Sequence, residues 1–168
     1  MARHPSASTA VGRDVTVVIG WFALLGVLSG VLWWLLVSPA EFTKLPSGGS
    51  MGEVELGRRF NADGWYVVIA AVFGLVSGLA LTWWRSRDPL LTSLLLIVGS
   101  AVAAALMALT GHLLGPGPTR AALASAKVGA RVPERLDVDT FVIYLCWPIA
   151  VFLGALVVLL GKDVDTTD

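Results

Sequence analysis

Four long stretches of this chain contain no Asp, Glu, Lys or Arg, although the sequence holds twelve acidic and twelve basic residues. The stretches are residues 15–37, 65–84, 90–114 and 140–160. A bilayer core about 30 Å thick is crossed by about 20 apolar residues of helix, so each stretch is long enough to span a membrane. We therefore expect an all-α membrane protein with four transmembrane helices.

The overall composition agrees with this expectation. Apolar residues make up 56% of the chain and charged residues 14%, a balance unlike that of a soluble domain. The formal net charge is zero, so we do not expect nucleic acid as a partner, because phosphate backbones require a surplus of Lys and Arg. The expected partners are the lipid bilayer and either another membrane protein or a second copy of this chain.

The connections between the spans are unequal in length. We expect one membrane domain with tails at residues 1–14 and 161–168 and two long loops, 38–64 and 115–139, that form a small extracytoplasmic cap. Basic residues that flank the spans on one face favour cytoplasmic termini, although the long loops hold more basic residues in total. The flanking residues are Arg13, Arg85, Arg87 and Lys162. The expected location is the inner (plasma) membrane, with several passes.

Each span carries small residues at a spacing that lets two helix backbones approach closely. The predicted helix-packing residues are Gly26, Gly30, Gly74, Gly78, Ala104, Ala108, Ala150 and Gly154. A pair on every span indicates a compact four-helix bundle, or packing against a partner. In the fourth span, Pro148 offers no amide to the Tyr144 carbonyl, so a kink is expected there.

The residues inside the spans do not predict catalysis. Ser29 and Ser77 lie within spans, but His112 lies near the outer end of the third span, so no base is available at the depth of Ser77. We expect both serines to pack or to bond helix backbone. The single cysteine, Cys146, excludes an intramolecular disulfide and a CxxC redox pair.

The two long loops hold the remaining polar groups. In the first loop, residues 46–50 are expected to be flexible, alternation at 53–56 predicts a short strand, and a turn at 61–64 precedes the second span, which Asp63 is expected to cap. In the second loop, Thr119 is expected to cap one or two helical turns. Opposite charges are expected to pair across the two loops.

The candidate residues for a site at the outer interface are His112, Asp137 and Asp139. Carboxylates and histidine are common metal ligands, so these three residues could be considered as a metal site. Their spacing, however, matches no known pattern of metal ligands. We therefore expect no metal, no cofactor and no catalytic residue.

The order of motifs along the chain resembles a known family. Asp63-Gly64-Trp65 opens a glycine-bearing second span, a short basic turn follows, the alanine-rich third span ends near Gly111, and Trp147-Pro148 stands in the last span. From about residue 15 to residue 161, this arrangement resembles an actinobacterial family of four-span membrane proteins defined as a domain of unknown function. The resemblance implies an actinobacterial inner-membrane protein with cytoplasmic termini, and it supplies no catalytic residue.

Two classes of function follow from the sequence. The favoured one is a non-enzymatic structural, accessory or interaction subunit. The alternative is a small carrier or channel for a neutral or lipid-like substrate, which would use the bend between Tyr144 and Pro148. An enzyme that acts at the outer interface through His112 is the third hypothesis.

Overall fold

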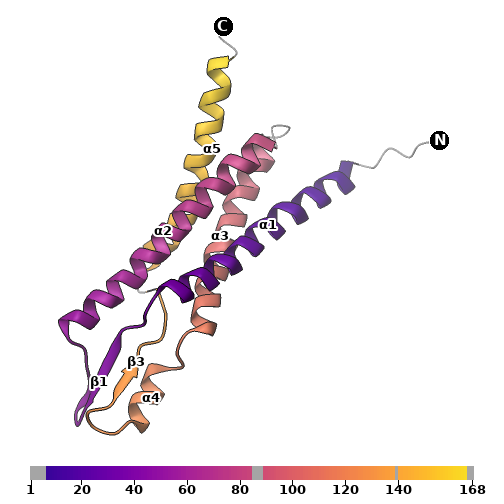
Figure 1. The fold of residues 1–168 in the computed structure, drawn as a ribbon. Coiled ribbons are helices and arrows are strands. Elements are labelled where there is room, and N and C mark those ends of the chain that lie inside the picture. The colour runs from indigo at the N-terminus through magenta and orange to yellow at the C-terminus, as the bar shows by residue number, and fades with distance from the viewer. Residues whose placement is uncertain (1–6, 85–88, 139, 166–168) are drawn as a thin grey trace.

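Four long helices dominate the computed structural model, which describes residues 7–84, 89–138 and 140–165 (Figure 1). They are α1 (Ala7–Leu36), α2 (Glu53–Trp84), α3 (Pro89–Leu114) and α5 (Cys146–Asp165), and the 3-10 helix η1 (Phe141–Leu145) leads directly into α5. All four are long and apolar enough to cross a membrane. Arg85, Arg87 and Asp139, which the sequence singled out, lie outside the described residues.

The remaining elements gather at one end of the four helices (Figure 1). They are the strands β1 (Glu41–Leu45), β2 (Gly48–Ser50) and β3 (Arg131–Pro133) and the short helix α4 (Thr119–Ser125). We call these four elements the sheet–helix unit. The N-terminal end of α1 and the C-terminal end of α5 lie at the opposite end of the molecule, where the two helices diverge.

Helix α1 packs closely on α3 because two of its glycines expose the backbone. A Cβ atom added at Gly26 would lie 2.7 Å from the carbonyl oxygen of Ala103, and one added at Gly30 would lie 2.6 Å from that of Met107. Real Cβ atoms do not approach oxygen so closely, so any larger residue would push the helices apart. These glycines therefore set the distance between α1 and α3.

Helix α2 also packs on α5 through glycines, and here both helices contribute them. A Cβ added at Gly74 would lie 2.9 Å from the Cβ of Ala150, and one added at Gly78 would overlap the carbonyl group of Val151. Gly154 of α5 in turn lies against the backbone of α2. The bundle thus consists of two tightly joined helix pairs, α1 with α3 and α2 with α5.

Large side chains fill the space between the two pairs. The largest fully buried ones are Trp33, Trp147, Tyr66, Phe22 and Met107. The polar atoms of two of these rings are satisfied across helices, since Trp33 Nε1 donates to the carbonyl of Ala62 at 2.8 Å and the Tyr66 hydroxyl donates to that of Ala104 at 2.9 Å. The rings of Trp33 and Tyr66 meet edge to face with centroids 5.3 Å apart.

The sheet has the order β2-β1-β3 and is antiparallel throughout. In its central strand, Thr43 lies opposite Ser50 on one side and opposite Arg131 on the other, so the sheet joins the two long loops. Helix α4 covers part of it, with Leu123 in contact with Gly49. Residues 46–50, expected to be flexible, form the hairpin turn and β2.

Two local predictions for the first loop are wrong. Residues 53–56 are the first turn of α2 rather than a strand, and residues 61–64 continue that helix rather than forming a turn, so Asp63 lies inside α2 and is not its N-cap residue. Glu53 and Glu55 suit the positive end of the helix dipole, and tertiary contacts hold the segment helical, because Trp33 binds the carbonyl of Ala62. Tertiary packing overrides the weak helix propensity of the segment.

Pro148 is the third residue of α5. Backbone amides in the first turn of a helix have no intrahelical acceptor, so a proline there costs no helix hydrogen bond. The sequence predicted a kink inside a continuous helix. The structure instead changes from the 3-10 helix η1 to the α-helix at Cys146, two residues before the proline. The proline therefore follows a change of helix type.

Replacing Gly78 with Leu is expected to separate α2 from α5, because the added side chain meets the backbone of Val151. Overpacking of this kind costs about 1–3 kcal/mol or more, so the melting temperature in detergent should fall. Gly20→Leu is the matched control, since nothing lies within 4 Å of a Cβ at Gly20. Thermal unfolding followed by size-exclusion chromatography checks this, and equal melting temperatures for the two variants would contradict it.

Candidate functional site

Residues 134–138, which we call the strap, run from β3 across the ends of the long helices. Leu136 anchors the strap and is only 4% exposed. It fits against α3 because Gly115 and Gly111 leave room there: a Cβ at Gly115 would lie 2.9 Å from that of Leu136, and a Cβ at Gly111 would overlap the ring of Trp33. The two glycines at the end of α3 therefore create the seat for the strap.

Polar contacts fix the first half of the strap. The amide of Glu134 donates to the carbonyl of Ala40 at 2.7 Å, and its carboxylate lies 3.7 Å from the guanidinium of Arg59 on α2. The amide of Arg135 donates to the hydroxyl of Thr119 at 2.8 Å. A helix does begin at Thr119 as predicted, but its N-cap residue is Pro118, and Thr119 binds the strap instead of capping.

Two of the three predicted outer-site residues come together where the strap meets α3. His112 Nδ1 lies 3.8 Å from Asp137 Oδ2, while Asp139 is outside the described residues. The two side chains are 27% and 63% exposed and attract each other only when the histidine is protonated, so the pair contributes at most about 1 kcal/mol. Across residues 7–84, 89–138 and 140–165, no three His, Cys, Asp or Glu side chains gather as metal ligands.

Opposite charges also pair between the two long loops, as expected from the sequence. Arg131 lies 3.5 Å from Glu41, and Arg59 lies 3.7 Å from Glu134. These ion pairs, together with the pairing of β1 with β3, bind the first long loop to the second.

A small cavity lies beneath the strap, where it meets the ends of the helices. Its volume is about 30 Å³, and its walls are Pro39, Ala40, Arg59, Ala62, Glu134, Arg135, Leu136 and Asp137. The Nε atom of Arg135 is buried and has no hydrogen-bond partner among the described residues. This cavity and its charged walls form the candidate site of the molecule.

The serines inside the helices lie in packed surroundings. The hydroxyl of Ser77 donates to the carbonyl of Phe73 at 2.7 Å and accepts a hydrogen bond from Trp21 Nε1 at 3.2 Å. Ser29 is fully buried between the glycines that join α1 to α3, and its hydroxyl has no partner within the described segments. Both serines are placed at helix contacts, where neither adjoins a described basic side chain that could activate it.

The predicted packing residues lie along the helix contacts. Gly26 and Gly30 face α3, and the four residues on α2 and α5 face one another, as described above. Ala104 is buried and its carbonyl binds Tyr66, and Ala108 packs against the edge of the core. The sequence reading did not identify Arg135 or Leu136, although the glycine spacing at the end of α3 is a signal for a closely packed neighbour.

Fold and site together define a mostly helical protein with four candidate membrane-spanning helices, the pattern of a multi-pass membrane protein, and its two long loops pair through one sheet. No protein-family model, no curated protein and no solved structure matches the chain. Function is therefore inferred from the geometry of this chain alone.

Replacing Leu136 with Ala is expected to release the strap, because it leaves a void between Gly115 and Trp33. Large-to-small changes of this kind cost about 2–5 kcal/mol, so amide hydrogen exchange over residues 131–138 should accelerate strongly. Leu113→Ala is the matched control, since Leu113 lies nearby on α3 but is 69% exposed. Unchanged exchange in the Leu136 variant would show that charge pairs alone hold the strap.

Proposed function

We propose that this protein is a non-enzymatic structural, accessory or interaction subunit of a membrane assembly. The observation that supports this most is the filled interior of the helices. Glycine contacts join the helix pairs backbone to backbone, and Trp33, Trp147 and Tyr66 occupy the space between them. A closely packed interior of this kind supports a rigid scaffold.

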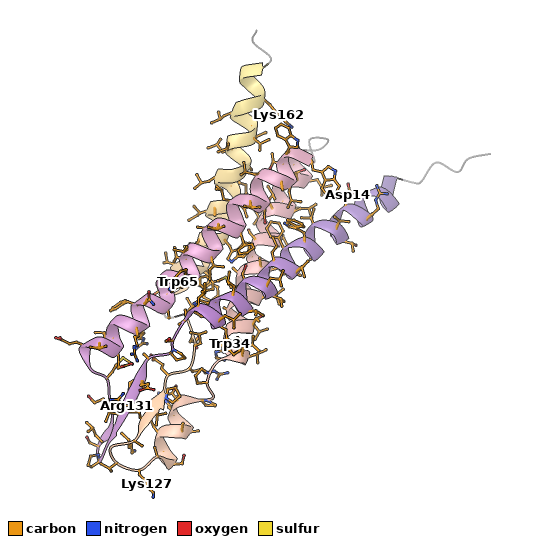
Figure 2. The ribbon with its side chains drawn as sticks, viewed as in Figure 1. Asp14, Trp34, Trp65, Lys127, Arg131 and Lys162 are labelled. Carbon is orange, nitrogen blue, oxygen red and sulfur yellow. The ribbon has the colours of Figure 1, made fainter. Side chains whose placement is uncertain are left out.

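The surface proposed to contact a partner is the distal end of the sheet–helix unit, farthest from the helices (Figure 2). We call it the tip and define it as Lys44, Leu45, Lys127, Val128 and Arg131. Val128 is 64% exposed and Leu45 is 41% exposed, and the β1–β3 pairing continues through a hydrogen bond from the amide of Gly129 to the carbonyl of Lys44. Two exposed apolar side chains that lie near Lys44, Lys127 and Arg131 suit a partner whose surface is acidic and partly apolar.

The proposed location is the inner membrane of a bacterium, with the sheet–helix unit outside as a cap and both termini in the cytoplasm. Trp34 and Trp65 lie toward the sheet–helix unit, whereas Asp14 and Lys162 lie toward the other end (Figure 2). Tryptophan at a membrane interface and basic residues beside cytoplasmic span ends support this placement. The resemblance to the actinobacterial four-span family points the same way.

The alternative is a small carrier or channel for a neutral or lipid-like substrate. It depends on an opening near Tyr144, yet the ring of Tyr144 packs on Tyr66 with centroids 5.9 Å apart and on Phe141 at 6.2 Å. Trp147, one turn further along, is fully buried. These contacts favour the scaffold over the carrier.

Cysteine labelling tests the orientation. In a Cys146→Ser background, Ser50→Cys and Ser125→Cys are expected to react with an impermeant maleimide in intact cells, because both lie in the sheet–helix unit. Gly161→Cys, near the far end of α5, is the control and should react only after permeabilisation. The reverse labelling pattern would place the sheet–helix unit in the cytoplasm.

Affinity purification in mild detergent tests the proposed function. The wild-type protein is expected to co-purify with a membrane partner at fixed stoichiometry, measured by mass spectrometry. The double variant Lys127→Glu, Arg131→Glu should lose that partner, because it reverses the charge of the tip.

Arg120→Glu is the matched control for this experiment. It reverses one charge on the same unit, where the double variant reverses two, and Arg120 lies at the start of α4, beside the strap rather than at the tip. Recovery of the wild-type protein as a lone, monodisperse species, or equal loss of the partner in both variants, would argue against the tip as the docking surface.

A further inference from the structure

The cavity beneath the strap combines charged and apolar walls from separate parts of the chain. Arg59 comes from α2, whereas Arg135 comes from the strap, and Pro39, Ala40 and Ala62 supply apolar surface. A volume of about 30 Å³ holds one or two oxygen atoms rather than a whole metabolite. The cavity therefore suits a single polar group carried by a larger molecule.

Arg135 is the charged residue of these walls whose side chain lacks a partner within the described segments. Glu134 lies 3.7 Å from Arg59, so this acid already has a cation nearby, whereas Asp137 lies 3.8 Å from His112. The Nε atom of Arg135 is buried without an acceptor. The side chain as a whole is partly exposed, but its Nε–H is shielded from water and gains from an acceptor, of which anionic oxygen is the strongest.

The position of the cavity indicates where such an oxygen could come from. Arg59 precedes Trp65 by six residues on α2, which is about 9 Å along the helix. On the other wall, Pro39 and Ala40 follow the end of α1 by three and four residues, and they stand five and six residues after Trp34. Tryptophan side chains concentrate at the level of lipid headgroups, so the cavity lies at the depth of headgroup phosphates.

We propose that Arg135 binds an oxygen of one phosphate group at this cavity, and that the phosphate belongs to the headgroup of a lipid in the adjacent leaflet or to a free phosphate compound. The position favours the lipid, whose glycerol and acyl parts stay outside the cavity against the apolar ends of the helices. Guanidinium matches phosphate through two parallel hydrogen bonds. This inference rests on the proposed membrane placement and is independent of the protein partner at the tip.

The test uses the full-length protein, purified in detergent and stripped of lipid. Native mass spectrometry measures binding of phosphatidylglycerol, and thermal unfolding measures stabilisation by inorganic phosphate. Arg135→Gln is expected to weaken lipid binding roughly tenfold or more, because it removes a charge-assisted hydrogen bond. Arg135→Lys keeps the charge but loses the planar fork, so it should recover part of the affinity.

Arg120→Gln is the matched control, since Arg120 is exposed on α4 and takes no part in the cavity walls. Helical content and elution volume confirm that each variant is folded. If Arg135→Gln does not fold, the comparison of wild type with Arg135→Lys tests the proposal instead. Saturable stabilisation by inorganic phosphate that depends on Arg135, without a matching lipid effect, would assign the site to a soluble phosphate. Equal binding of both probes by wild type and Arg135→Gln would overturn the proposal, whatever the partner experiment gives.

Discussion

The close approach of helix backbones at glycine residues is the contact on which the rest of this structure depends. In a bilayer the lipid tails are as apolar as leucine, so helices associate through van der Waals packing and hydrogen bonds rather than by escape from water. Gly30 and Gly78 bring two helix pairs to backbone contact. Each pair then presents one face to the other, and Trp147, whose Nε1 donates to the sulfur of Met107, fills the space between them.

The joint between the helices and the sheet–helix unit depends more on burial than on charge. Full burial of a leucine contributes about 1.5–3 kcal/mol, whereas an exposed ion pair contributes about 0–1 kcal/mol. Leu136 therefore holds the strap in place, and the pairs formed by Glu134 and Asp137 determine its register. At this joint, the buried Nε atom of Arg135 has no hydrogen-bond partner among the described residues.

The four helices could be predicted from the sequence because the exclusion of charge is a local property of each stretch. The sheet could not, since β1 pairs with β3 from the other end of the chain and neither strand alternates strongly. The extension of α2 before Trp65 was missed because Gly57, Asn61 and Gly64 disfavour a helix locally. His112 and Asp137 were identified from residue type, whereas Arg135 was not, because its significance comes from burial.

Helix α2 has 32 residues and is therefore about 48 Å long, well beyond the thickness of a bilayer core. Its inner part packs tightly on α5. Its outer part carries Arg59 and Glu55, and the Glu55 carboxylate accepts a hydrogen bond from the amide of Glu41 at the start of β1. Only its apolar part, residues 65–84, which is about 30 Å long, matches a bilayer core, so the charged outer part would extend beyond that core. In a membrane, a change in the tilt of α2 would therefore move the sheet–helix unit as well, so the orientation of this helix in lipid would determine the position of that unit.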